Sequence, residues 1–123
     1  MAISDFNGDA FNDIVAVNQN GGYSVLMSDG VTGFITTSYT GAINQNYVVA
    51  VLVNGDEFQD FVISNGNGAD VYLGNGDGTF SVITSAIIAV SGSRALSAAD
   101  YNTDGITDIA ILENSAGQVE IFL

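Results

Sequence analysis

The stretch that decides the fold is Asp100-Tyr101-Asn102-Thr103-Asp104-Gly105-Ile106-Thr107-Asp108, which leads directly into Ile109-Ala110-Ile111-Leu112. Asp or Asn stands at its positions 1, 3, 5 and 9, and Gly stands at position 6. In a tightly curled loop, alternate residues turn their oxygen atoms inward, and oxygen ligands are what Ca²⁺ prefers. The β-branched run that follows predicts a strand. We therefore expect a calcium-binding loop that opens a strand.

The same pattern occurs twice more in the chain. Asp5-Phe6-Asn7-Gly8-Asp9-Ala10-Phe11-Asn12-Asp13 precedes Ile14-Val15-Ala16-Val17, and a degenerate copy, Leu52-Val53-Asn54-Gly55-Asp56-Glu57-Phe58-Gln59-Asp60, precedes Phe61-Val62-Ile63. The closing aspartates are 47 and then 48 residues apart. Asp and Asn also favour ordinary turns, because they bond their own backbone. Three copies at near-constant spacing nevertheless predict a repeat protein, with the loop as the mark of each repeat.

Composition excludes several classes of function. The 123 residues, enough for one domain, include 14 acidic residues and one basic residue, giving a net charge of −13. Such a chain would be repelled by nucleic acid and by anionic membrane surfaces. No apolar run approaches the length of a membrane span, so we expect no membrane insertion. The absence of His, Cys and Lys removes the common bases and nucleophiles, and we expect no enzymatic activity.

Short runs rich in Val, Ile, Tyr and Phe, bounded by Gly, Asn, Asp and Ser, predict an all-β fold. No segment keeps a period of 3.6 residues over the length of a helix. We predict antiparallel four-stranded blades of a β-propeller, about 2.75 blades in all, over residues 1–46, 47–92 and 93–123. A β-solenoid is the competing architecture, but tight Gly/Asn turns favour antiparallel hairpins. The predicted strands are 3–4, 13–17, 23–27, 34–39, 47–53, 60–64, 69–73, one within 80–90, 95–99, 108–112 and 119–123.

Two further features have simple structural readings. Gly74-Asn75-Gly76-Asp77-Gly78-Thr79 is neither followed by Lys nor placed before a helix, so a hairpin turn is favoured over a phosphate-binding loop. The five tyrosines are predicted to pack between blades or line a rim, in preference to stacking on sugars.

Taken together, residues 5–17, 100–111 and Gly74-Asn75-Gly76-Asp77-Gly78-Thr79-Phe80 resemble the FG-GAP/VCBS repeat, which builds the β-propeller of integrin α subunits. In that family the acidic loop joins the first strand of a blade to the second and binds Ca²⁺. The resemblance implies that Ca²⁺ binds in the third and first loops. The implied ligands are Asp100, Asn102, Asp104, the carbonyl of Ile106 and Asp108 in the third loop, and Asp5, Asn7, Asp9, the carbonyl of Phe11 and Asp13 in the first.

Two departures from the family pattern affect these sites. Ala10 replaces the usual Gly of the first loop, at a cost of about 1 kcal/mol if that position needs a positive φ. In the second loop, Leu52 and Glu57 replace the first Asp and the Gly, while Asn54, Asp56 and Asp60 remain. The second loop is expected to bind weakly, to bind with Glu57 as a substitute ligand, or to be empty.

Propellers of this family are mostly extracellular and serve in adhesion, in carbohydrate recognition or beside catalytic domains. We therefore expect a non-catalytic, calcium-stabilised module, extracellular or at the cell surface, that serves adhesion or binds a glycan or protein ligand. A closed propeller typically needs at least four blades. The expected partners are thus the remainder of a longer propeller or other copies of this chain. The alternative function is a structural subunit that self-assembles into a ring or a filament.

Overall fold

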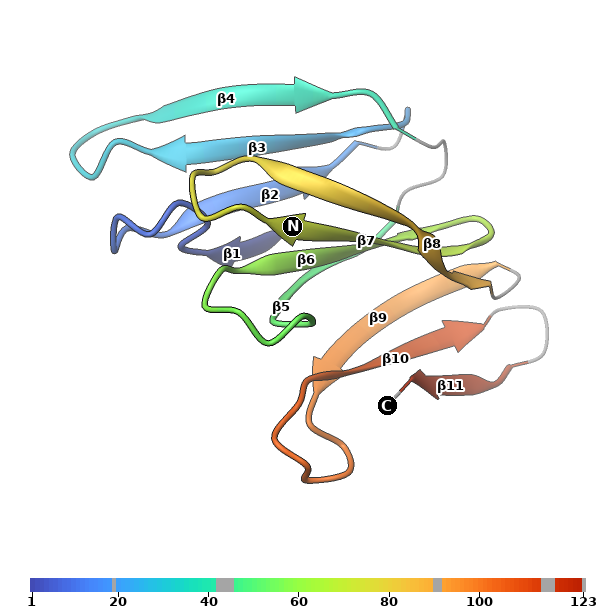
Figure 1. Cartoon of the computed structure of the whole chain (residues 1–123). Coiled ribbons are helices and arrows are strands. Elements are labelled where there is room, and N and C mark those ends of the chain that lie inside the picture. Colours follow the sequence, from blue (N-terminus) through green and yellow to red (C-terminus); the bar gives the residue numbers. More distant parts are fainter. Residues whose placement is uncertain (19, 42–45, 90–91, 114–116, 123) are drawn as a thin grey trace.

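A computed structural model describes residues 1–18, 20–41, 46–89, 92–113 and 117–122, and in them it contains strands and no helix (Figure 1). The all-β prediction is confirmed. The strands form three antiparallel sheets, each with its strands in chain order. The first holds β1 (Ala2–Ser4), β2 (Asp13–Val17), β3 (Tyr23–Ser28) and β4 (Phe34–Tyr39); the second holds β5 (Val48–Val51), β6 (Asp60–Asn65), β7 (Gly68–Gly74) and β8 (Phe80–Ala89); the third holds β9 (Ser93–Ala99), β10 (Asp108–Glu113) and β11 (Val119–Phe122).

The strand boundaries differ from the predicted ones by a few residues. The strand expected over 47–53 is only β5, Val48–Val51. It ends early because the N–H of Val53 donates to the carboxylate of Asp60 at 2.9 Å instead of joining the ladder. β7 and β9 begin earlier than predicted, at Gly68 and Ser93. The predicted ends of two strands at residues 90 and 123 lie outside the described residues.

The three sheets are consecutive blades that follow one another face to face (Figure 1). We call the face of a blade that is turned toward the next blade its forward face, and the opposite one its backward face. Side chains alternate between the two faces of a strand. Val62 of β6 belongs to the core shared with the third blade, whereas Phe61 and Ile63 belong to the core shared with the first. Every residue of β6 is buried, and its central residues, Phe61-Val62-Ile63, are apolar on both faces instead of alternating with polar ones.

Aromatic rings fill the space between the first two blades. Phe61 stacks on Tyr72 at a centroid distance of 4.7 Å and meets Phe80 edge-on, also at 4.7 Å. Phe6 of the first acidic loop lies 5.6 Å from Phe80 and 6.2 Å from Phe61. Tyr23 lies 5.4 Å from Phe61. Edge-on and stacked pairs of this kind add to the stabilisation that burial itself supplies.

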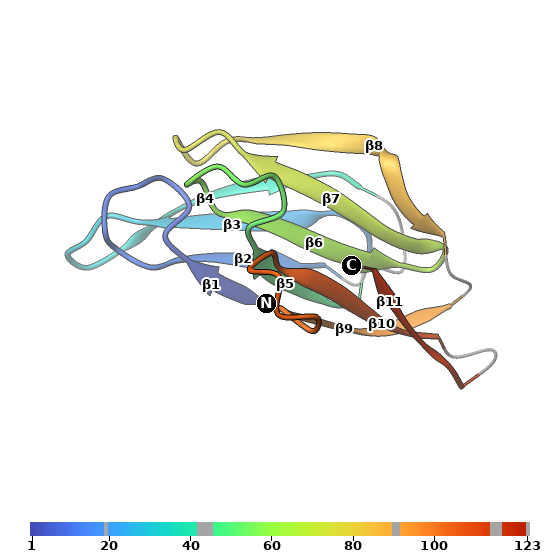
Figure 2. The same ribbon diagram turned by 60° about the horizontal axis from the view of Figure 1, so that its bottom comes forward.

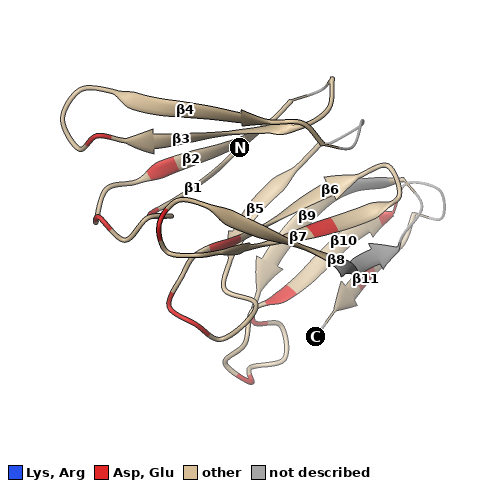
Figure 3. Ribbon diagram, turned by 45° about the horizontal axis from the view of Figure 1, so that its top comes forward, with Lys and Arg blue, Asp and Glu red and all other residues tan. Residues whose placement is uncertain are grey.

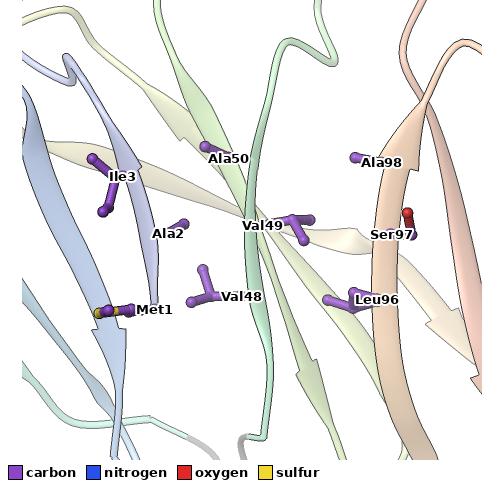
Figure 4. Close-up of a pocket in the computed structure, with 9 residues that line it drawn as sticks. All are labelled: Met1, Ala2, Ile3, Val48, Val49, Ala50, Leu96, Ser97 and Ala98. Atoms are coloured by element: carbon purple, nitrogen blue, oxygen red, sulfur yellow. The ribbon is translucent and has the colours of Figure 1, made fainter.

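The innermost strands, β1, β5 and β9, are neighbours across the three blades (Figure 2). They border an open hollow of about 410 Å³. Figure 4 shows that the side chains that line it are aliphatic apart from the hydroxyl of Ser97 and the thioether of Met1. The lining residues are Met1, Ala2, Ile3, Val48, Val49, Ala50, Leu96, Ser97 and Ala98. Within the described residues, the chain has no helix of the length and apolar character that spanning a membrane requires.

Candidate metal-binding loops

The acidic loops join β1 to β2, β5 to β6 and β9 to β10, so they occupy corresponding places in the three blades. In an antiparallel sheet, the turn between the third and fourth strands lies at the same end as the loop between the first and second. Asp29 and Asp77 stand in two such turns. Eleven of the 14 acidic residues therefore lie at one end of the blades (Figure 3). The loops are recognisable in the sequence, but their position at the same end of the blades as the turns that hold Asp29 and Asp77 is not.

In the first loop, the carboxylate of Asp5 accepts hydrogen bonds from the main chain. Its Oδ1 accepts from the N–H groups of Gly8 at 2.8 Å, Asp9 at 3.2 Å and Asn7 at 3.3 Å, and its Oδ2 accepts from Ala10 at 2.8 Å. Desolvation raises the pKa of Asp5, but the four main-chain hydrogen bonds together outweigh it and hold this pKa below its usual value. The loop is thus wound around its first side chain.

The next two oxygen-bearing residues continue the winding. Asn7 Oδ1 accepts from the N–H of Asp9 at 3.0 Å, and Asp9 Oδ1 accepts from the N–H of Phe11 at 2.8 Å. Asn7 Nδ2 also donates to Asp9 Oδ2 at 2.9 Å. Positions 3 and 5 of the loop therefore each bond the N–H two residues on, which sets alternate side chains on the inside of the curl.

The third loop reproduces this network. Asp100 Oδ2 accepts from Gly105 at 2.9 Å, Asn102 Oδ1 accepts from Asp104 at 2.8 Å, and Asp104 Oδ1 accepts from Ile106 at 2.8 Å. Asn102 Nδ2 donates to Asp104 Oδ2 at 2.9 Å. The same contacts recur although the two loops share only four of nine side chains, so the Asp and Asn positions alone carry the local structure.

The second loop keeps only part of the network. Asn54 Oδ1 accepts from the N–H of Asp56 at 3.1 Å, and Asp56 Oδ1 accepts from the N–H of Phe58 at 2.9 Å. Asn54 Nδ2 donates to Asp56 Oδ2 at 2.7 Å. Leu52 has no oxygen to offer at position 1. This loop therefore lacks the side chain around which the other two are wound.

The closing aspartates play a part that the sequence analysis did not anticipate. Each is fully buried and lies at the start of the second strand of its blade. Asp13 Oδ2 accepts from Phe6 N at 2.9 Å and its Oδ1 accepts from Ser28 N at 2.8 Å. The carboxylate ties the loop to the end of the third strand. Whether it also binds a metal stays a prediction.

We call the two main-chain hydrogen bonds to a closing aspartate the brace. The second blade has both bonds, and the third blade has one of them. Asp60 accepts from Val53 N at 2.9 Å and from Gly74 N at 2.8 Å. Asp108 Oδ2 accepts from Tyr101 N at 2.8 Å, but its buried Oδ1 has no hydrogen-bond partner among the described residues. In the first two blades that partner is the last residue of the third strand. In the third blade the corresponding position lies beyond the described part of β11, because Ile109 already pairs with Phe122.

Backbone dihedral angles explain why glycine recurs in the loops. Position 6 has a positive φ in the first and third loops, at Ala10 (71°) and Gly105 (89°), which confirms the conformation on which the expected cost of Ala10 depends. Position 4 has a positive φ in all three loops, including Thr103 (64°). The predicted loop pattern contains no requirement at position 4, although Gly8 and Gly55 stand there in two of the three loops.

The donor atoms of the first and third loops suit a hard cation, because they are carboxylate, amide and carbonyl oxygens on exposed loops. Within the described residues, no group of three or more acidic side chains is gathered as a metal site. The network accounts for this: the closing carboxylate faces the interior, and two carboxylates remain in the curl. A carboxylate oxygen that accepts one N–H keeps a second lone pair, so these residues fit Ca²⁺ by donor type.

The turn at residues 74–80 is a hairpin turn between β7 and β8, as predicted, and each glycine in it has a packing reason. A Cβ on Gly74 would lie 2.3 Å from the main-chain oxygen of Gln59. One on Gly76 would lie 2.4 Å from the Phe58 ring, and one on Gly78 would lie 2.7 Å from Met27 Cε of the first blade. The turn therefore fits beneath the acidic loop of its own blade and against the preceding blade.

The tyrosines divide between interior and surface. Tyr23 stacks on Tyr39 at 4.8 Å and meets Tyr72 at 5.0 Å, between the first two blades. Burial raises the pKa of both Tyr23 and Tyr72 above the ordinary value. Tyr47 and Tyr101 are exposed. Packing between blades is therefore confirmed for three of the five, and the other two lie at the surface.

Asp29 gives a pH prediction that is independent of any metal. Its Oδ1 accepts from the N–H groups of Gly33, Val31 and Thr32, each at 2.9 Å, and these bonds hold the pKa of Asp29 below 3.8. A depressed folded-state pKa contributes stability that is full above the unfolded pKa and is lost as pH falls through the folded one. We expect the urea midpoint of Asp29→Asn to fall less steeply than that of the natural chain on acidification below pH 3.8.

The measurement is a series of urea unfolding curves across that pH range. Glu120→Gln is the matched control, because Glu120 is exposed and accepts none of these main-chain bonds. Equal slopes for Asp29→Asn and the natural chain would contradict the prediction.

Comparison with models of known protein families gives a match to part of the chain. Residues 53–111 match the family model described as an FG-GAP-like repeat. The matched segment begins in the second acidic loop and ends within β10, so it includes the second and third closing aspartates. Searches of curated proteins and of solved structures give no match.

Proposed function

Because residues 53–111 form an FG-GAP-like repeat, we propose that the chain is a non-catalytic, calcium-stabilised β-propeller module for adhesion or ligand binding, extracellular or at the cell surface. The observation that carries the proposal is the shared network of the first and third loops. In both, the position 1 carboxylate accepts from position 6, while positions 3 and 5 each accept from the residue two further on. Repeats of this family are generally non-catalytic.

Two loops would hold the metal. Asp5, Asn7, Asp9, Asp13 and the carbonyl of Phe11 would supply the first site, and Asp100, Asn102, Asp104, Asp108 and the carbonyl of Ile106 the third. When bound, Ca²⁺ supplies positive charge among these oxygens. The second loop lacks an acidic residue at position 1, and we infer that Asn54, Asp56 and Asp60 bind more weakly.

Electrostatics supports a cation in these loops. Two carboxylates about 5 Å apart repel by roughly 3 kcal/mol at an effective dielectric constant near 20. Eleven of the 14 acidic residues lie at one end of the blades, so bound Ca²⁺ would reduce repulsion both within each loop and between blades. A ligand at about 100 times its dissociation constant stabilises the folded state by about 2.7 kcal/mol per site.

Chelation is the first test. We expect the melting temperature to fall when excess chelator replaces millimolar Ca²⁺, because two sites lose their stabilising ligand. Asp100→Ala should lose about half of this calcium-dependent shift. Asp56→Ala, a change of the same kind in the degenerate loop, is the matched control and should retain nearly all of it. A melting temperature that does not respond to chelator would refute the calcium proposal.

The extracellular location is inferred from the expected affinity. Extracellular calcium modules typically bind at about 10⁻⁴ to 10⁻³ M, which the exterior of a cell supplies and the cytosol does not. The class of ligand, a glycan or a protein, depends on surface loops that vary freely on one fold. A glycan array probed with the calcium-loaded chain tests the carbohydrate class.

A further inference from the structure

The first and third blades each have one face that no other part of the described chain covers. The forward face of the third blade presents Tyr101, Ala110, Leu112, Val119 and Ile121. The backward face of the first blade presents Met1, Ile3, Ile14, Leu26 and Phe34. We call these the forward end face and the backward end face.

The forward end face repeats a surface that is covered elsewhere in the chain. Ala110 and Ile121 are cross-strand partners in the third blade, as Val15 and Val25 are in the first. Val25 is 1% exposed because the second blade covers it, whereas Ile121 is 50% exposed. Apolar pairs thus stand at the same register in both blades: Val15 and Val25 are both buried, whereas in the third blade Ala110 is buried and Ile121 is exposed.

The loop residue after position 1 shows the same contrast. Phe6 is 1% exposed and packs against Phe61 and Phe80 of the second blade. Tyr101 is its counterpart in the third loop and is 44% exposed. Beside Tyr101 the forward end face has an apolar hollow of about 300 Å³.

The backward end face is the complementary surface. Met1 and Val48 hold corresponding places on the innermost strands, and they are 80% and 6% exposed. Phe80 is partly buried against Phe6, whereas its counterpart Phe34 is exposed. The ring at this position thus packs against the preceding blade in the second repeat and is half exposed in the first.

The register extends this correspondence to the middle of the sheet. Ile14 pairs with Leu26 across β2 and β3, in the positions that Phe61 and Tyr72 hold across β6 and β7. Phe61 and Tyr72 are buried against the first blade. The backward end face thus presents apolar side chains at the positions that make the contact between blades inside the chain.

We propose that the forward end face binds the backward end face of a second copy of this chain, and that two copies close a ring of six blades. The chain already joins a forward face to a backward face twice, so the new contact continues an existing series. The described residues form three blades, so two copies give six, within the four to eight of typical propellers, whereas three copies give nine. A twofold axis would make the two contacts identical. This proposal goes beyond the proposed function, and the face contacts do not involve Ca²⁺.

Light scattering and sedimentation of the 123-residue chain test the proposal. We expect a discrete species of about twice the 12.7 kDa chain mass. Ile121→Asp and Ile3→Asp, one on each end face, should each give a monomer, because a carboxylate would be buried in the contact. Both side chains are exposed within one copy, so the folded monomer tolerates the change. Retained β-sheet circular dichroism verifies this.

Ile35→Asp is the matched control. Ile35 is also an exposed isoleucine of the first sheet, but it pairs with Met27 and lies on neither end face. This variant should remain a two-copy species. Mixing Ile121→Asp with Ile3→Asp should restore a two-copy species of lower affinity, because one intact pair of end faces remains in the mixture.

Three outcomes would overturn the proposal: a monomeric natural chain, a two-copy species that survives both end-face variants, or a polydisperse series in place of a closed pair. Each measurement is made in Ca²⁺ and in chelator. A melt that ignores chelator, together with assembly that depends on the end faces, would refute the calcium proposal and keep this one. A melting temperature that falls in chelator, together with assembly that survives both end-face variants, would support the calcium proposal and refute this one.

Discussion

Replacement of Asp60 by alanine is expected to lower the free energy of unfolding by about 3–5 kcal/mol. Its carboxylate is fully buried and accepts from Val53 N at 2.9 Å and Gly74 N at 2.8 Å. A hydrogen bond to a charged group contributes about 1.5–3 kcal/mol, and the substitution leaves two main-chain donors without an acceptor. The free energy of unfolding of a small domain is about 5–15 kcal/mol, so this loss should be a large fraction of the total. Urea unfolding at neutral pH measures it.

Asp108→Ala is the matched control for this prediction. Asp108 is equally buried, but within the described part of the chain only its Oδ2 accepts a hydrogen bond, and the change also removes the unpartnered Oδ1. We expect a cost of about 1–2 kcal/mol. Both variants are measured in chelator, which separates the brace from any part in metal binding. Equal losses of unfolding free energy for Asp60→Ala and Asp108→Ala would contradict the stabilising effect of the second hydrogen bond to Asp60.

Replacement of Phe61 by alanine is expected to lower the free energy of unfolding by about 3–5 kcal/mol, because it removes a fully buried ring between the first two blades. Phe61 is fully buried and meets four other rings, those of Phe6, Tyr23, Tyr72 and Phe80. The protein interior relaxes only partly around such a cavity. Urea unfolding measures the loss.

The control for this prediction is Phe58→Ala. Phe58 is three residues away in the same blade but is exposed over Gly76. Its removal should cost well under 2 kcal/mol, since little apolar area is lost from the interior. A cost for Phe61→Ala no larger than that for Phe58→Ala would contradict the packing between blades.

Much of the fold was predictable because it depends on short-range chemistry. β-branched runs that end in Gly, Asn and Asp fix the strands, and the spacing of Asp13, Asp60 and Asp108 fixes the repeat. Strand ends were less predictable, since the early end of β5 depends on a bond between Val53 and a residue seven positions away. Local propensity carries no information about such a contact.

The sequence predicts which residues form the loops, but not which of them bond within the loop and which bond to the rest of the sheet. Spacing groups Asp5, Asn7 and Asp9 as one oxygen-lined curl, which the structure forms. The same spacing places Asp13 with them, yet its carboxylate faces the interior and reaches Ser28, 15 residues on. That partner is set by the register of β2 and β3, which only the assembled sheet defines.

The burial of the second blade on both faces has a consequence for how the chain opens. In arrays whose units contact only their neighbours, stability is a sum of unit and interface terms, so a unit with two interfaces is held more firmly than one at an end. Amide protons of β6 would exchange only when both flanking blades have detached, whereas those of β4 and β11 exchange on local fraying. The protein thus carries a gradient of opening free energy from its middle toward both ends, and pairing of the end faces would flatten that gradient.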